Sequence, residues 1–232
     1  MVTGILAVLA IGGLLGFRHA FEPDHLAAVS TLASRPGPKS VWSVARLGLA
    51  WGLGHTVTLG AVALLVLALG ARVPPSLWPS AELAVAALLM LLGGTVVWRY
   101  ARGRWHMHLH AHEGDPHFHL HSHAQDAGHA HGHARADARR SLGFGVAHGL
   151  AGSGAIAVLL AAAAPTPGLR VAYFAAFGAG TIVGMLAVSI TLGVLIRVAS
   201  ARGARWATLL HVGSALVSVG AGVALAWRVV WD

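Results

Sequence analysis

Side chains that bind transition metals interrupt a hydrophobic segment near the start of the chain, in the stretch GFRHAFEPDHLAAV (residues 16–29). The imidazole groups of His19 and His25 and the carboxylate of Asp24 suit nickel, cobalt or zinc, whereas calcium and magnesium prefer oxygen ligands alone. The chain has no cysteine, so nitrogen and oxygen atoms must hold any metal ion. The stretch therefore predicts a metal site made by His19, Asp24 and His25.

Arg18 and Glu22 lie in the same stretch and are accessory candidates. Their spacing also suits a simple helical ion pair, with the histidines making hydrogen bonds only, or a bend at the membrane surface. We favour the metal site, because each charge in the middle of a bilayer costs about 2.5–3.5 kcal/mol and folding alone does not explain that cost.

Pro23 predicts a break in this segment. A straight helix over residues 2–33 would be about 48 Å long, whereas the hydrocarbon core of a bilayer is about 30 Å thick. Proline has no N–H to donate to the carbonyl of His19, four residues earlier, and we expect that carbonyl to be left free. A kinked turn here would bring His19, Asp24 and His25 together.

Two further histidines, His55 in WGLGHTVTLG and His148 in VAHGLAGSG, stand alone among glycines and apolar residues. Such a histidine can simply form a hydrogen bond across a close helix contact. We nevertheless expect both to complete the metal site, because an internal repeat places the segments of His19 and His148 at equivalent positions and His55 in the adjoining span.

The most conspicuous compositional feature is a histidine-rich tract between two hydrophobic halves. Its histidines are His106, His108, His110, His112, His117, His119, His121, His123, His129, His131 and His133. Neutral imidazole is a common ligand for nickel, zinc, copper and cobalt, and the tract has almost nothing apolar to bury. We expect a flexible metal buffer or sensor; a linker with incidental metal affinity is the alternative.

The chain as a whole is 56% hydrophobic and 10% charged over 232 residues, which favours a polytopic membrane protein over a soluble helical bundle. We expect an all-α fold with six spans, at about 2–33, 41–71, 80–100, 141–164, 169–197 and 205–230. The expected domains are residues 1–100, a polar loop at 101–140, and residues 141–232. The net charge of +8 comes mainly from arginines in short loops, so we do not expect nucleic-acid binding.

The basic residues sort by side of the membrane. Three alternate loops contain Arg35, Lys39, Arg46, Arg99, Arg102, Arg104, Arg135, Arg139, Arg140, Arg197, Arg202 and Arg205, whereas the other side has Arg72, Arg170 and Arg228. Positive charge favours the cytoplasmic side. In a prokaryotic inner membrane this predicts that both termini lie outside and that the histidine-rich loop is cytoplasmic.

The two halves resemble each other at nearly equal offsets. GFRHAFEPDHLAAVSTLA resembles GFGVAHGLAGSGAIAVLLA, GLGHTV resembles GAGTIV, and each half ends near a Trp-Arg pair. Three spans per copy force the second copy to be inverted, which is a common transporter architecture with the binding site at the repeat interface. We therefore expect a 3+3 inverted repeat, in which Glu82 falls opposite His211 as a further accessory pair.

The spacing His-x4-Asp-His in RHAFEPDHLAA resembles the signature of the nickel/cobalt transporter family, and LGHTV resembles its second histidine motif. This resemblance implies that His19, Asp24, His25 and His55 carry substrate recognition. Six spans, and His148 in place of a later acidic motif, make the chain more similar to shorter members, including those linked to urease assembly and the histidine-loop exporters.

Together these features predict a secondary transporter of Ni²⁺ or Co²⁺, with Zn²⁺ as a further candidate and uptake as the favoured direction. The chain has no phosphate-binding loop for ATP and no recognisable nucleophile and base, so we do not expect an enzyme. The alternatives are an efflux protein, or a membrane-anchored reservoir or chaperone for a metalloenzyme such as urease. A cytoplasmic metallochaperone is an expected partner.

Overall fold

A computed structural model describes residues 2–33, 40–69, 77–102, 105–112, 115–122, 133–150 and 166–231. Its elements are α1 (Val2–His19), α2 (Pro23–Ala33), α3 (Val41–Leu69), α4 (Leu77–Ala101), β1 (Trp105–His112), β2 (Asp115–Ser122), α5 (His133–Leu150), α7 (Pro167–Arg202) and α8 (Ala204–Trp231).

Most helices of this chain have a length and an outer surface that suit a lipid environment. Among the described residues, α3, α4, α7 and α8 are each long and apolar enough to cross a membrane. The bent pair α1 and α2 is a fifth candidate if the two helices together form one span. Large apolar side chains also face outward, as at Leu14 (70% exposed) and Val217 (62% exposed). Exposing such an apolar surface to water costs free energy, whereas exposing it to lipid does not. The protein is therefore a multi-pass α-helical membrane protein.

The predicted fourth span, 141–164, extends beyond α5 into residues outside the described part of the chain. The six-span count therefore stays a prediction. The start of α5 also differs from the expectation, because this helix begins at His133, inside the region assigned to the polar loop.

The predicted break of the first span is confirmed, since α1 and α2 meet at 55°. Pro23 is the first residue of α2, a position where its missing N–H costs no hydrogen bond. The expectation of a free His19 carbonyl was wrong, because the Glu22 N–H donates to it at 3.1 Å. At the end of α1 the chain forms a tighter turn, in which an N–H donates to the carbonyl three residues earlier. This hydrogen bond satisfies the carbonyl oxygen to which Pro23 cannot donate.

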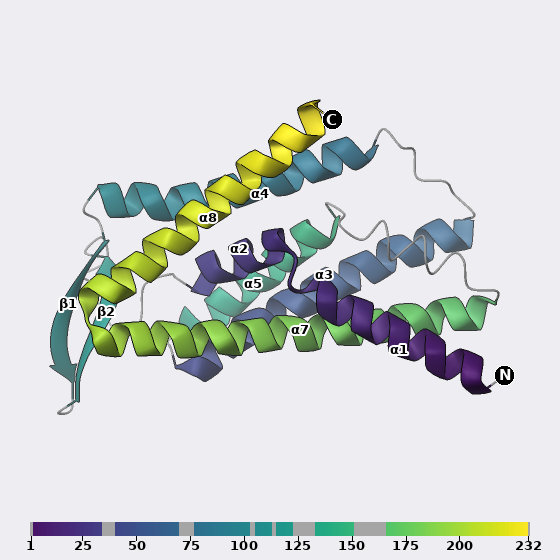
Figure 1. Cartoon of the computed structure of the whole chain (residues 1–232), viewed down its shortest axis with the longest axis horizontal. Coiled ribbons are helices and arrows are strands. Elements are labelled where there is room, and N and C mark those ends of the chain that lie inside the picture. Colours follow the sequence, from purple (N-terminus) through teal and green to yellow (C-terminus); the bar gives the residue numbers. More distant parts are fainter. Residues whose placement is uncertain are drawn as a thin grey trace.

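The helices form layers (Figure 1). α4 and α8 lie side by side along one edge, α1 and α7 along the other, and α2, α3 and α5 lie between them. Close approach depends on glycine: a Cβ at Gly16 would collide with the backbone of Phe177 across α1 and α7, and one at Gly145 with the backbone of Trp51 across α3 and α5. These contacts fix where the central histidines stand.

The histidine-rich tract contains an antiparallel hairpin, β1 and β2, which corrects the prediction of a wholly flexible loop in an all-helical chain. Histidine alternates with other residues in both strands, which matches the two-residue period of a strand. A lone hairpin is marginally stable in water, but this one contacts α4, α7 and α8 at their ends. His123, His129 and His131 lie outside the described residues, and His133 opens α5.

Candidate metal centre

Four helices bring the five predicted principal ligands together in the interior. His19 is the last residue of α1, Asp24 and His25 open α2, His55 lies in α3 and His148 in α5. All four imidazoles are buried, with exposures between 0% and 5%, and the Asp24 side chain is 18% exposed. The cluster therefore depends on helix packing rather than on one local motif.

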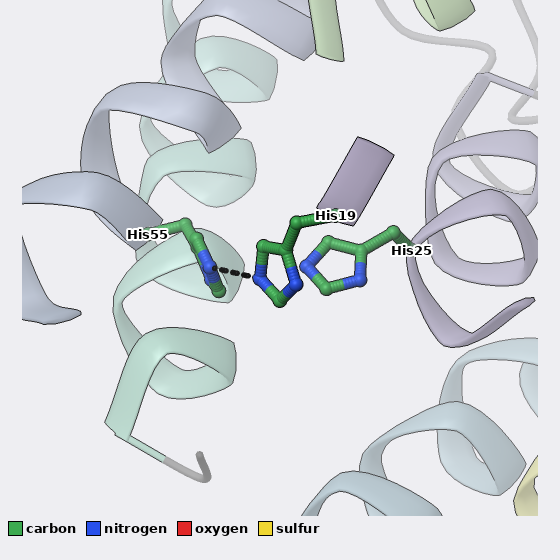
Figure 2. A group of neighbouring side chains, drawn as sticks. All are labelled: His19, His25 and His55. Carbon is green, nitrogen blue, oxygen red and sulfur yellow. Dashed lines mark hydrogen bonds between the residues drawn. The ribbon is translucent and has the colours of Figure 1, made fainter. Parts of the chain in front are cut away.

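The first part of the cluster contains His19, His25 and His55, whose ligand atoms lie within 4.8 Å of one another. The Nε2 atoms of His19 and His55 are 3.1 Å apart, and the His25 ring meets the His19 ring edge-on with centroids 4.5 Å apart. Figure 2 shows the three rings converging from separate helices. Two nitrogens that bind one ion at about 2.1 Å each lie about 3 Å apart, so this spacing suits a shared ion.

The second part contains Asp24, His25 and His148, which also lie within 4.8 Å of one another. One carboxylate oxygen of Asp24 is 3.1 Å from His25 Nδ1, and the other is 3.1 Å from His148 Nε2. Asp24 thus links the start of α2 to α5. His25 belongs to both parts of the cluster.

The local sequence explains this convergence. The break between α1 and α2 turns the chain inside the bundle, so that residues on both sides of Pro23 reach one place. Gly149 lies against the backbone of His55, where a Cβ would collide with its carbonyl oxygen. That contact holds α5 close enough for the His55 and His148 rings to stand 5.6 Å apart.

Buried nitrogen atoms in the cluster are left without partners. Within the described residues, His25 Nε2, His55 Nδ1 and His148 Nδ1 have no hydrogen bond. Buried polar atoms are rarely left unsatisfied, and several in one place call for an explanation such as an ion or water. Imidazole nitrogens, together with one partly buried carboxylate, make a donor set that fits a divalent transition metal.

Comparison with known proteins identifies the family. Over 190 residues the chain is 30% identical to the urease accessory protein UreH of Bacillus sp. (strain TB-90), covering 82% of this chain and 78% of that protein. The chain belongs to the UreH family. This relative is an accessory protein, in agreement with the prediction that the chain is not an enzyme. No family model matches the chain, and no solved structure matches it.

Glu22 touches the cluster from outside. Its carboxylate lies 3.1 Å from His19 Nδ1, on the ring edge opposite the contact with His55, and its side chain is 44% exposed. Carboxylates in this position orient a metal-binding histidine and raise its basicity. Arg18, the helical partner considered for Glu22, is exposed.

Glu82 and His211 do not belong to either part of the cluster. Glu82 accepts a hydrogen bond of 2.7 Å from Arg228, which joins α4 to α8, and His211 Nδ1 donates to the carbonyl of Ala207 in its own helix. The printed contacts of both residues thus lie outside the two parts of the cluster, and their accessory role stays a prediction. The alignment of the two halves placed them opposite each other but carried no information on what surrounds each side chain.

Two aromatic residues that the sequence reading missed form the walls of the cluster. The Trp51 ring lies 5.6 Å from the His148 ring, and the Phe177 ring lies 5.4 Å from the His19 ring, measured between centroids. Both are buried. Trp51 stands one helical turn before His55 in the same glycine-rich motif, and that spacing was an available signal. Phe177 comes from the packing of α7 on α1, which no local pattern indicates.

Proposed function

We propose that the protein carries Ni²⁺ across a prokaryotic inner membrane, with Co²⁺ as the next candidate cargo and Zn²⁺ as a third, and with uptake as the favoured direction. The observation that carries the proposal is the cluster of four buried histidines and one aspartate, which lies between the candidate span α3, the bent pair α1–α2 and α5. Intramembrane ionisable groups are costly and usually mark an ion pathway.

The family supports nickel in particular. The UreH relative is named as an accessory protein of urease, and urease is a nickel enzyme. The donor set agrees, because imidazole with one carboxylate suits nickel, cobalt and zinc better than calcium or magnesium. The nickel/cobalt transporter motif from His19 to His25 points the same way.

The helix contacts support a 3+3 inverted repeat. If α1 and α2 correspond to the segment beginning with α5, and α3 and α4 to α7 and α8, an exchange of halves converts the α1–α7 contact into the α5–α3 contact. Both pairs pack extensively, and the α3–α7 and α4–α8 pairs map onto themselves. A cluster between α1, α2, α3 and α5 then lies at the repeat interface, where rocking of the halves can open it to either side.

The hairpin and the two termini lie at opposite ends of the bundle (Figure 1). The arginine distribution favours a cytoplasmic hairpin end. In this orientation the histidines of the hairpin are placed to collect arriving ions, and to pass them to a cytoplasmic metallochaperone.

Uptake of radiolabelled nickel by cells that express single variants tests this function. We expect His25→Ala and Asp24→Asn to lose uptake, because each removes a ligand of the cluster. Glu82→Gln is the matched control for Asp24→Asn, since it neutralises a carboxylate outside the cluster, and we expect it to retain uptake. Wild-type uptake in both cluster variants, at equal protein levels, would remove the proposal.

The hairpin favours a second candidate function, a membrane-anchored reservoir that supplies a metalloenzyme without moving ions across the bilayer. The two functions differ in what they need: a reservoir needs the hairpin and a transporter needs the buried cluster.

Deletion of the gene separates uptake from efflux, because loss of an importer lowers cell nickel and loss of an exporter raises it.

A further inference from the structure

His25 contacts ligands on two sides of its ring. Its Nδ1 atom lies 3.1 Å from Asp24, which itself contacts His148. Its other nitrogen, Nε2, points toward the His19 ring (Figure 2) and has no hydrogen-bond partner among the described residues. One imidazole thus stands between the pair His19 and His55 and the pair Asp24 and His148.

A single ion cannot use both sides of this ring. The two nitrogens of an imidazole point away from each other, so an ion bound to Nε2 lies outside the reach of Nδ1. The close ligand contacts show the same division, because His19 Nε2 pairs with His55 Nε2, and Asp24 Oδ2 with His148 Nε2, each at 3.1 Å. The five ligands therefore form two triads rather than one shell.

We propose that the cluster holds two adjacent ion positions that share His25 and are filled alternately, by one ion at a time. The first position consists of His19, His25 Nε2 and His55, and the second of Asp24, His25 Nδ1 and His148. The proposal rests on the proposed function, in which a divalent transition-metal ion is the cargo.

The alternation follows from the chemistry of imidazole. A neutral ring has one lone pair and one N–H, so His25 can complete only one position at any moment. When the ion moves, its bond to Nε2 breaks and a bond to Nδ1 forms; the Nδ1 proton passes to solvent water, and solvent water returns one proton to the vacated Nε2. Charge is conserved on the ring, and the ion gains the Asp24 carboxylate as it arrives.

The two positions have different surroundings. The first adjoins Glu22, a half-exposed carboxylate that contacts His19. The second lies beside the buried Trp51 ring, which stands 5.6 Å from His148. The two positions thus have different neighbours, a half-exposed carboxylate beside the first and a buried indole beside the second.

Cobalt binding to the purified full-length protein tests the proposal. Visible absorption of Co²⁺ reports the donor atoms, and the triple variant His19→Ala/His25→Ala/His148→Ala serves as the blank because it leaves one ligand per position and an unchanged hairpin. Relative to this blank, we expect one Co²⁺ in the wild type. His55→Ala should keep one ion with an oxygen ligand, and His148→Ala should keep one with nitrogen ligands, giving two different spectra.

Three results would overturn the two positions: two Co²⁺ ions in the wild type, identical spectra in the two variants, or loss of the ion from either variant to the level of the blank. Gln replacements at residues 55 and 148 keep most of the side-chain volume and provide a second pair if the Ala variants aggregate. The number of bound Co²⁺ ions and the spectra of these two Gln variants are then judged by the same three results.

Nickel uptake separates this proposal from the proposed function. We expect both single variants to bind cobalt yet transport nickel at least about tenfold more slowly, because the ion has no second position to enter. Uptake at the wild-type rate in either variant would also contradict the two steps. Wild-type uptake in His25→Ala would contradict the proposed transport function itself. Loss of uptake together with identical Co²⁺ spectra in the two variants would contradict only the two ion positions.

Discussion

At the scale of single residues, the centre depends on imidazole nitrogens that are deeply buried and, for three of them, unpaired within the described structure. Such nitrogens destabilise a fold unless something completes their bonding. In the proposed function a divalent ion would complete the bonding of His25 Nε2, with Asp24 supplying negative charge against it. His55 Nδ1 and His148 Nδ1 lie on the ring sides away from the contacts with His19 and Asp24.

Glu22 should tune the site without being essential to it. In the proposed function, its contact with His19 Nδ1 would orient that ring and make Nε2 a stronger electron-pair donor to the ion. Loss of such an outer carboxylate weakens metal binding by about 10- to 100-fold. We therefore expect Glu22→Gln to raise the nickel concentration for half-maximal uptake by about tenfold with little change in maximal rate. Glu82→Gln is the control, and equal curves for the two variants would contradict this role.

At the scale of secondary-structure elements, glycine decides how closely the helices approach. Gly145 lies against the backbone of Trp51 and His55, whereas Gly143, in the same helix, has nothing within 4 Å of an added Cβ. Because α5 carries His148, the spacing of α3 and α5 also sets the geometry of the metal centre.

Gly145→Ala should therefore separate α3 from α5, and Gly143→Ala should not. Overpacking typically costs about 1–3 kcal/mol. We expect Gly145→Ala to lower the unfolding midpoint in detergent and to weaken Co²⁺ binding relative to the triple-variant blank, and Gly143→Ala to match the wild type. Indistinguishable behaviour of the two variants in both measurements would contradict this packing.

The elements also show what a sequence can and cannot reveal. The break near Pro23 and the gathering of the five candidate ligands were predictable, because proline chemistry and isolated polar residues in apolar spans are local signals. The occupied His19 carbonyl, the hairpin and the early start of α5 were not. Each depends on a turn or a packing contact, as do the Phe177 wall and the Glu82–Arg228 pair, which joins residues 146 apart.

At the scale of the whole molecule, the protein combines a cluster of four buried histidines and one aspartate with a histidine-rich hairpin at one end of the bundle (Figure 1). The hairpin register sets His106 opposite His121, His108 opposite His119 and His110 opposite His117. Directly opposite residues of an antiparallel pair share one face of the ribbon. The hairpin register thus pairs histidine with histidine at three positions.

Deletion of residues 105–122 should distinguish the role of the hairpin from that of the buried cluster. We expect the shortened protein to bind fewer nickel ions per chain and to keep uptake within about twofold of the wild type, because the cluster is intact. Bound nickel in the purified protein and uptake by cells measure the two effects. If uptake disappeared while the protein remained folded and in the membrane, the reservoir function would be favoured.

Orientation can be tested without background, because the chain has no cysteine. Arg102→Cys lies beside the hairpin end and Trp231→Cys near the C-terminus, and both wild-type side chains are exposed. We expect a membrane-impermeant maleimide to label Trp231→Cys in intact spheroplasts and Arg102→Cys only after permeabilisation. The opposite labelling pattern would invert the proposed topology.

The central claim is that a cluster of imidazole and carboxylate groups inside the membrane carries a transition-metal ion across it. Nickel flux into proteoliposomes that contain only the purified protein tests it most directly. The account predicts flux well above protein-free vesicles for the wild type and for Glu82→Gln, and background flux for His25→Ala and Asp24→Asn. Background flux with the wild type, or full flux with both cluster variants, would contradict it.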